Sequence, residues 1–254
     1  MSILRRTVLA GLAASAVPVQ AQRRPDVPFV VTPMPVVDAM LDLAMLRPGE
    51  KLVDLGSGDG RIVLAAARRG AEAMGVEIDA ELVDRARRRA ELESLQARAR
   101  FSRGDLFEAA VRDADVVTIY LLTSINQRLR PKLLNELKPG ARVVSHAFDM
   151  GDWRPDGQRM IEEKQIYLWI VPAVVGGAWR LSVDDTTQTL SFEQRYQQVV
   201  GDLDGEAITD TALRGDRLFF RASGRAFHGI VGERAVLPDP AHADGVAGWR
   251  MERP

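Results

Sequence analysis

Residues 51–61 decide the fold and read Lys-Leu-Val-Asp-Leu-Gly-Ser-Gly-Asp-Gly-Arg. The first half is a short apolar strand, and the second half has glycine at every second position. An apolar helix pattern follows over residues 61–67. Glycine adopts positive φ and lets a ligand approach the backbone closely, and the free N–H groups at a helix start face that ligand. The stretch predicts a nucleotide-binding turn, since a plain β-turn needs one or two glycines rather than three in alternation.

Two kinds of nucleotide fold use such a turn. The dinucleotide fingerprint is G-x-G-x-x-G, but Arg61 stands where its third glycine belongs. The observed pattern, D-x-G-x-G-x-G, resembles motif I of class I S-adenosylmethionine (SAM) methyltransferases. That resemblance implies that Asp54 receives the ammonium group of SAM, directly or through water. It also implies that the turn passes under the methionine part of the cofactor: Gly56, Ser57, Gly58 and Gly60.

Composition limits the class of protein. The chain has 254 residues, 46% hydrophobic and 27% charged, as in an ordinary globular protein. Its size allows one large domain, or one medium domain with an appendage. The formal net charge of -1 gives no electrostatic reason to expect nucleic acid as a partner. There is no Cys, and the histidines lack metal-ligand spacing, so we expect no disulfide and no metal site.

Residues 1–21 are expected to be a targeting segment. Arg5 and Arg6 form a basic start, and the apolar run over residues 8–17 is too short to span a bilayer. Ala21 is a small residue of the kind that precedes a signal-peptidase site. The paired arginines resemble a twin-arginine signal, which predicts export to a bacterial periplasm and a mature chain without a transmembrane segment. An uncleaved N-terminal membrane anchor is the alternative.

Strand and helix patterns alternate after residue 29. We expect strands at 52–55, 73–77, 98–102, 116–122 and 141–145, and helices at 33–46, 61–67, 80–95 and 124–137. This alternation predicts an α/β fold with a parallel, Rossmann-like sheet and helices on both faces. Ligands of such sheets bind outside the carboxyl ends of the strands.

Thr32 precedes the first expected helix. It is predicted to be the N-cap, with Pro33 at the first helical position. Because this helix start should lie near the glycine turn, Thr32 is predicted either to cap the helix alone or also to touch the cofactor.

Two acids follow the second and third strands. Glu77 lies 17 residues after Gly60, near the spacing of about 20 expected for an acid that binds ribose hydroxyls; a surface glutamate is the alternative. In methyltransferases an acid at the position of Asp105 accepts from the adenine amino group, and the backbone of the next residue, Leu106, contacts the ring. Asp105 is also predicted to be the N-cap of a short helix.

Further segments narrow the resemblance. The Thr32-Pro33 helix entry, the glycine turn and residues 145–153, Ser-His-Ala-Phe-Asp-Met-Gly-Asp-Trp, resemble the small protein-lysine methyltransferases related to the mitochondrial enzymes that modify the ATP synthase c-subunit and the adenine nucleotide translocase. The likeness covers about residues 29–155. It implies SAM as cofactor and a protein substrate, with membrane-associated proteins as the first candidates.

The ends of the fourth and fifth strands carry the acceptor-site candidates, none of which receives a catalytic role: Tyr120, Asn126, His146, Asp149 and Trp153. Tyr120 is predicted either to line a methyl channel, since aromatic faces favour ammonium groups, or to be a core residue. His146 either accepts a proton or is structural. Asp149 and Trp153 belong either to a substrate loop or to an ordinary turn.

The C-terminal part is expected to complete the sheet and then change character. Residues 164–171 and 178–183 are predicted to form the terminal hairpin of a seven-stranded sheet, so the methyltransferase domain should cover residues 29–183. Short strands follow at 189–196, 217–221, 226–231 and 248–251. Residues 184–254 are therefore predicted to be a small β-rich extension. It binds substrate, mediates self-association or packs against the sheet, and packing is the leading prediction.

Three functions compete on the sequence. The fourth strand end has an apolar mouth with one aromatic and lacks the N-P-P-Y arrangement that methylates planar nitrogens, which favours a lysine ε-amine made neutral by desolvation. A methyltransferase for a small envelope metabolite is the second hypothesis. The third is an exported SAM-binding module without turnover, against which the intact cofactor motif argues.

Overall fold

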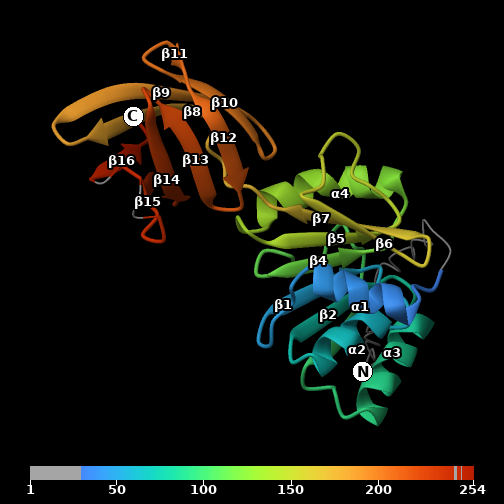
Figure 1. Cartoon of the computed structure of the whole chain (residues 1–254). Helices are drawn as coiled ribbons and strands as arrows, with labels where there is room; N and C mark the ends of the chain where they lie inside the picture. Colours follow the sequence, from blue (N-terminus) through green and yellow to red (C-terminus); the bar gives the residue numbers. More distant parts are fainter. Residues whose placement is uncertain (1–29, 243–244, 247) are drawn as a thin grey trace, which may run out of the picture.

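The computed structural model describes residues 30–242, 245–246 and 248–254, which form two units (Figure 1). The first unit is built on a seven-stranded sheet with the order β3-β2-β1-β4-β5-β7-β6. The second is a nine-stranded sheet with the order β11-β10-β9-β8-β16-β15-β14-β13-β12. The predicted targeting segment, residues 1–21, lies outside the described residues.

Strands and helices alternate in the first unit, and its strands β1 to β5 run parallel. Strand β7 is antiparallel to both β5 and β6. This confirms the predicted Rossmann-like methyltransferase sheet with a β-rich extension. The elements are α1 (Met34–Leu43), β1 (Lys51–Leu55), α2 (Arg61–Arg68), β2 (Glu72–Glu77), α3 (Ala80–Leu92), β3 (Ala99–Arg103), β4 (Val116–Ile119), α4 (Thr123–Glu136), β5 (Arg142–His146), β6 (Gly157–Ile161) and β7 (Lys164–Ile170).

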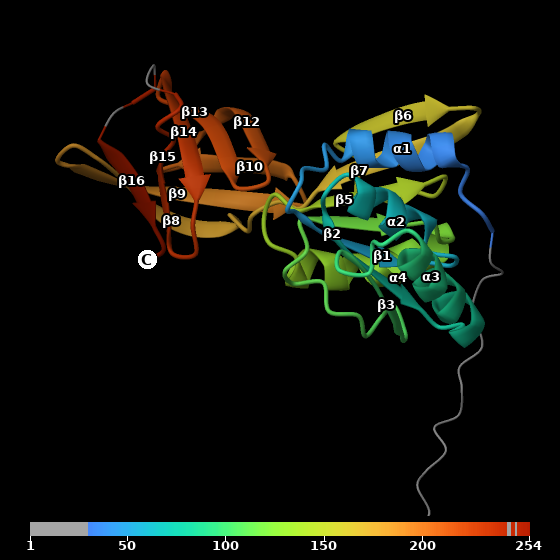
Figure 2. The same ribbon diagram turned by 90° about the horizontal axis from the view of Figure 1, so that it is seen from below.

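Each face of the first sheet has its own core. One core joins α1, α2 and α3 to the sheet, and the other joins α4 to the opposite face (Figures 1 and 2). Successive side chains of β1 alternate between the two, with Leu52 in the first core and Val53 in the second. Every residue of β4 is buried, as expected for a central strand of a parallel sheet that is covered on both faces.

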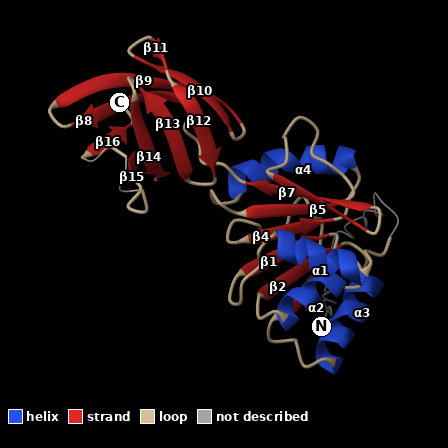
Figure 3. Ribbon diagram, in the orientation of Figure 1, coloured by secondary structure: helices blue, strands red, loops and turns tan. Residues whose placement is uncertain are grey.

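The second unit consists of strands and loops (Figure 3), and all its paired neighbours are antiparallel. The sheet curls until β12 approaches β10, where the Thr211 hydroxyl donates to the Val199 carbonyl at 2.5 Å. Its core is aromatic, with Trp179, Phe220 and Trp249 inside. The strands are β8 (Gly177–Val183), β9 (Thr186–Arg195), β10 (Gln198–Leu203), β11 (Glu206–Ala207), β12 (Thr209–Arg214), β13 (Arg217–Ala222), β14 (Arg225–Val231), β15 (Ala235–Pro238) and β16 (Trp249–Glu252).

The predicted terminal hairpin of the first sheet is wrong in one strand. Residues 178–183 lie in β8 of the second sheet, where Trp179 and Leu181 point into the aromatic core. The partner of β7 is instead β6, whose middle residues are exposed. An alternating strand looks the same in the sequence whichever sheet it joins, and the exposed β6 has little apolar signal. The two sheets are therefore joined through residues 171–176.

The second unit attaches at the amino edge of the parallel strands. The last residue of β7, Ile170, pairs with Arg142, the first residue of β5. Beyond it, the Ala173 N–H donates to the Gly215 carbonyl at 2.8 Å. Gly215 packs so closely on Gly140 that a Cβ on Gly215 would lie 2.9 Å from the Gly140 Cα. The glycine turn, which follows β1, lies at the opposite edge.

Helix length and polarity also bear on membrane insertion. Within residues 30–254, leaving aside 243, 244 and 247, no helix has the length and apolar character needed to cross a bilayer.

Because the second unit has a core of its own, we expect Phe220→Ala to destabilise that unit. Phe220 is fully buried and stacks on Phe227 with ring centroids 4.8 Å apart. Removing a buried phenyl ring should cost about 3–5 kcal/mol of unfolding free energy. Phe219→Ala is the matched control, because this neighbour is only partly buried on the other side of β13. Guanidinium unfolding should show a clearly smaller loss for the control; equal losses would contradict the assigned core.

Candidate functional site

The backbone of residues 56–60 requires its glycines. Gly56, Gly58 and Gly60 have φ values of 79°, 52° and 81°, in the left-handed region that glycine tolerates best. A Cβ on Gly60 would lie 2.7 Å from the Phe101 ring. A Cβ on Gly56 would lie 3.2 Å from Leu121. The turn therefore holds its shape only with glycine at these positions, as its pattern predicted.

Ser57 lies inside this turn with its hydroxyl buried. Its Oγ has no hydrogen-bond partner among the described residues. Gly75 in β2 makes room for it, since a Cβ there would lie 2.5 Å from Ser57 Oγ. A buried polar atom without a partner is costly, so Ser57 is a natural contact for a ligand in the turn.

Glu77 connects the end of β2 to the glycine turn. Its Oε2 accepts from the Gly58 N–H at 2.9 Å. Its Oε1 accepts from the Ile78 and Asp79 N–H groups at 2.8 and 3.0 Å. A carboxylate has about four acceptor positions, two on each oxygen, so Oε2 keeps one position for a ligand hydroxyl while Oε1 is already occupied by two N–H groups. The role of Glu77 in binding ribose stays a prediction. Its carboxylate is held in place by three N–H groups at the end of β2, where a ribose-binding acid is expected.

Asp54 is buried at the end of β1. It is 2% exposed, and Thr118 Oγ1 donates to its Oδ1 at 2.8 Å. Burial raises the pKa of Asp54 to about 7, and the charges of Glu77 and Asp59 add to this rise, while the Thr118 hydrogen bond opposes it. A buried carboxyl of this kind favours a cationic ligand, which would restore its ionised form.

A second acid of the turn, Asp59, forms an ion pair that the sequence analysis did not single out. Arg61 Nη2 donates to Asp59 at 2.7 Å, and Arg61 Nη1 donates to the Thr32 carbonyl at 2.9 Å. Burial alone would raise the pKa of Asp59, but the hydrogen bonds and charges of Arg61 and Arg89 hold it below its ordinary value. The pair ties the glycine turn to the segment that enters α1.

Thr32 does not cap α1, so that prediction is wrong. Pro33 is the N-cap residue, and its carbonyl accepts from Val36 and Val37 N–H groups at 3.0 Å. The helix thus begins one residue later than expected. The Thr32 side chain is buried instead at 3.2 Å from His146 Nδ1.

His146 lies at the end of β5 between Thr32 and the ring of Tyr120. Tyr120 packs on it with centroids 3.9 Å apart, and Phe148 lies 6.0 Å from Tyr120. Burial, with a smaller effect of the Lys164 charge, lowers the pKa of His146 to about 4. The imidazole is therefore neutral at pH 7, and its buried Nε2 has no partner within the described chain.

Asn126, in the first turn of α4, holds the loop that follows β5. Its Nδ2 donates to the carbonyls of Phe148 and Asp149, each at 3.1 Å. Ser145 Oγ donates to the Phe148 carbonyl at 2.6 Å. Asn126 Oδ1 is buried without a partner among the described residues. The side chain that was predicted to bind substrate thus orients the loop and leaves one acceptor atom open.

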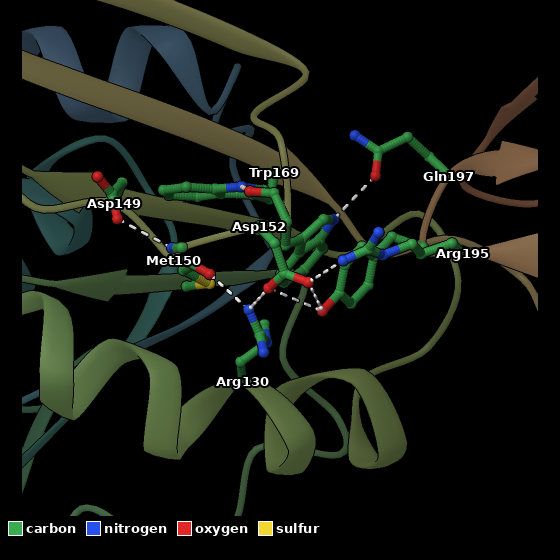
Figure 4. Close-up of polar contacts among 10 residues, drawn as sticks. Arg130, Asp149, Met150, Asp152, Trp169, Arg195 and Gln197 are labelled. Atoms are coloured by element: carbon green, nitrogen blue, oxygen red, sulfur yellow. Dashed lines mark hydrogen bonds and ion pairs between the residues drawn. The ribbon is translucent and has the colours of Figure 1, made fainter.

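Asp149 and Trp153 lie in the same loop but have different surroundings; Figure 4 labels Asp149 in this loop. Asp149 accepts from the Gly151 N–H at 2.9 Å and is partly exposed. Trp153 is fully buried between Trp169 and Tyr196, with centroid distances of 6.0 and 5.9 Å. The structure brings together Tyr120, Asn126, His146 and Asp149. Trp153 lies apart from them at the junction of the two units, where its buried indole offers no surface to a substrate.

Asp105 follows β3 next to the end of β2. The Gly104 N–H donates to the Glu77 carbonyl at 2.9 Å, so the two strand ends are neighbours. Asp105 Oδ1 accepts from the Phe107 N–H at 2.9 Å, but the residues that follow form a turn and no helix. The helix-cap prediction is therefore wrong, while the adenine roles of Asp105 and Leu106 stay predictions.

Sequence reasoning also missed Thr118, the partner of Asp54. Its signal was a single hydroxyl inside an otherwise apolar strand, Val116–Ile119. The only sequence signal for the Asp59–Arg61 ion pair was the spacing of two residues between an acid and a base.

Comparison with known proteins places this site in context. A family model described as the ANTKMT methyltransferase domain matches residues 54–157. A protein-lysine N-methyltransferase of Saccharolobus islandicus is 40% identical over 153 residues, which cover 58% of this chain and 95% of that protein. The adenine nucleotide translocase lysine N-methyltransferase of Mus musculus is 44% identical over 133 residues, 52% of this chain and 58% of that protein.

A solved structure extends the comparison. It is described as an RNA methyltransferase from Salinibacter ruber in complex with S-adenosyl-L-homocysteine, with 51% sequence identity and a TM-score of 0.57. The match covers 57% of this chain and 96% of that chain. The archaeal and Salinibacter proteins are thus matched almost completely, whereas the mouse relative is matched over little more than half its length. Together with the family match at residues 54–157, this indicates that the shared part is the first unit.

The burial of Asp54 predicts a pH-dependent effect of Asp54→Asn on stability. Because the folded-state pKa is raised to about 7 from 3.8, the folded parent holds a proton that the unfolded chain releases. The stability of the parent relative to the variant should be greatest below pH 4, fall as the pH rises to 7 and level off above it. The total change should be on the order of a few kcal/mol.

Denaturant unfolding of the ligand-free protein between pH 4 and 8.5 measures this difference. Asp113→Asn, at an exposed aspartate, is the matched control. A difference between parent and Asp54→Asn that stays constant over this range would show that the carboxyl is not buried as described.

Proposed function

Because the chain belongs to the protein-lysine N-methyltransferase family, we propose that it transfers a methyl group from SAM to the ε-amine of a lysine in a protein substrate. The family match and the relative solved with S-adenosyl-L-homocysteine make the chain a SAM-dependent methyltransferase. The observation that carries the acceptor proposal is the apolar, aromatic mouth at the ends of β4 and β5, described below.

The residues at the carboxyl edge fit SAM. The left-handed glycine turn lets a ligand approach, Ser57 offers an unpaired hydroxyl, and Asp54 is a buried acid suited to an ammonium group. We propose that Glu77 holds the ribose and that Asp105 and Leu106 hold the adenine. When bound, SAM supplies a methyl group on a sulfonium, so that the protein has mainly to position and desolvate the acceptor.

The acceptor side suits a lysine amine. An aromatic wall of Tyr120, His146 and Phe148 attracts an ammonium group by its π-faces. Exclusion of water lowers the pKa of that ammonium and favours the neutral nucleophile. His146, whose pKa is held near 4, adds no positive charge that would repel it, and the open Oδ1 of Asn126 is an acceptor for an N–H of the amine.

We further propose that the substrate is membrane-associated. Val30, Val31 and Met34 lie within two positions of Thr32, and Leu122 follows Tyr120 by two positions, so these residues adjoin the mouth along the chain. They are 55%, 44%, 39% and 42% exposed. An exposed apolar rim of this kind is typical of a surface that contacts an apolar partner.

Two other acceptors are specific enough to test. The Salinibacter relative is described as an RNA methyltransferase, which makes RNA a second candidate. The net charge of -1 gives little attraction for a polyanion. A small envelope metabolite is the third candidate acceptor. A chain that binds SAM without turnover would have no acceptor.

The acceptor prediction is tested with isotope-labelled SAM and separate membrane, soluble-protein, RNA and low-mass fractions of host cells. We expect label on lysines of membrane proteins, located by peptide mass spectrometry. The control is Gly58→Val, because a β-branched residue resists the φ of 52° at this position and should lose SAM binding in calorimetry. Label confined to RNA or to low-mass material would replace the lysine proposal. SAM binding with no label in any fraction would leave a binding module.

We propose export through the twin-arginine route, on the basis of Arg5-Arg6 before a short apolar run that ends at Ala21. Changing both arginines to lysine should keep the protein in the cytoplasm when cell fractions are compared by immunoblot. Periplasmic delivery of that variant would indicate the general secretory route, and a cytoplasmic parent would show that the segment is not an export signal.

A further inference from the structure

The loop of residues 147–156 joins the acceptor side of the site to the second unit. It starts at the carboxyl edge after β5, where Asn126 holds the Phe148 and Asp149 carbonyls. It ends beside β7, where the Asp156 N–H donates to the Leu168 carbonyl at 2.8 Å. The loop therefore runs along the α4 face, and its far half lies against the second unit (Figure 4).

The tip of the β9–β10 hairpin, residues 195–197, contacts the second half of this loop at Asp152. Arg195 donates to Asp152 at 2.6 Å, and the Tyr196 hydroxyl lies 3.2 Å from both carboxylate oxygens. Arg130 of α4 donates to the same carboxylate at 2.5 Å and to the Met150 carbonyl at 2.7 Å. Arg195, and after it Arg130, hold the pKa of Asp152 at about 2, so the carboxylate stays ionised.

The same tip fixes the next two residues. The Trp153 indole N–H donates to Gln197 Oε1 at 3.0 Å, and Gln197 Nε2 donates to the Arg154 carbonyl at 2.7 Å. The Tyr196 ring stacks on Trp153 at 5.9 Å and lies 5.3 Å from the Arg130 guanidinium. The hairpin thus touches three consecutive loop residues by hydrogen bonds, charge and ring stacking.

The hairpin turn has a strained backbone at Tyr196. β9 and β10 are joined by two residues only, Tyr196 and Gln197, between the paired Arg195 and Gln198. Tyr196 has a φ of 55°, a left-handed conformation in which Asn or Gly is usual at such turns and which strains a bulky residue. A strained aromatic that docks into a functional loop indicates a role beyond closing the hairpin.

We propose that Tyr196 and Gln197 are positioning residues, which brace the loop of residues 147–156 and so set its acceptor end at Phe148 and Asp149. This inference rests on the proposed function for the meaning of that end. The Saccharolobus and Salinibacter relatives are matched almost completely, yet the matches cover little more than half of this chain. The contact of Tyr196 and Gln197 with the loop is therefore a feature that this chain adds to the shared unit.

The test uses the full-length protein with Tyr196→Asn, which relieves the turn and removes the ring. Tyr196→Phe keeps the ring and the strain and removes only the hydroxyl. Ser223→Asn is the matched control, since Ser223 also occupies a two-residue turn of the second sheet with a φ of 46°.

The first readout is hydrogen exchange at Ala147 and Phe148, whose N–H groups bond to the Gln165 and His146 carbonyls. Both residues precede the loop residues that the hairpin contacts, Asp152 to Arg154. We expect roughly tenfold faster exchange in Tyr196→Asn, little change in Tyr196→Phe and none in Ser223→Asn. The second readout is kinetic. The acceptor KM should rise about tenfold in Tyr196→Asn, because small misplacements of a reacting group are costly, while SAM affinity stays within twofold.

Unchanged exchange at Ala147 and Phe148 in a folded Tyr196→Asn protein would overturn the inference. A parallel loss of SAM affinity would overturn it as well, because it would show general loosening rather than positioning of the acceptor end. If the parent protein methylates nothing, the proposed function fails, and the exchange result alone still decides whether the hairpin braces the loop.

Discussion

The hydrogen bond from the Gly58 amide to the Glu77 carboxylate is the contact on which the site depends. It joins the turn after β1 to the end of β2, so the two neighbouring strand ends act as one rigid edge. Glycine supplies the left-handed backbone that aims this amide at the carboxylate. The same edge is continued by Asp105 after β3, since the β2 and β3 ends share a backbone hydrogen bond. The cofactor-binding edge thus follows from the order of the strands and from the conformational freedom of glycine.

Buried polar groups are concentrated at this edge, although they weaken the ligand-free fold. Asp54 is an acid whose pKa is raised by burial, and Ser57, Asn126 and His146 each have one buried atom without a partner in the described structure. Elsewhere the first unit is packed with apolar side chains. Proteins retain such unfavourable groups where a ligand compensates them. The cost in stability and the capacity to bind are therefore two aspects of the same residues.

Much of the fold was predictable because its signals are local. The glycine alternation and the strand–helix alternation indicate the parallel sheet and its ligand-binding edge from the sequence alone. Most of the failures concern contacts between residues far apart in the sequence. The side chain of Thr32 contacts His146, 114 positions away, and no local sequence pattern predicts that contact. The exposed strand β6 has little apolar signal, and β8 alternates in the way that a strand of either sheet would. Trp153 was assigned to a loop correctly, but its burial depends on Tyr196 and Gln197 of another unit.

The attachment of the second unit at the amino edge has an evolutionary consequence. A single-unit ancestor could gain this sheet by gene fusion without displacing any residue of the cofactor edge, because the join at residues 171–176 follows the last strand of the shared part. Each unit has a core of its own, so a mutation inside the core of one unit leaves the core packing of the other in place. Selection can therefore remodel most of the added sheet without touching the cofactor edge, and only the hairpin tip at residues 195–197 is constrained by its contacts with the loop of the first unit.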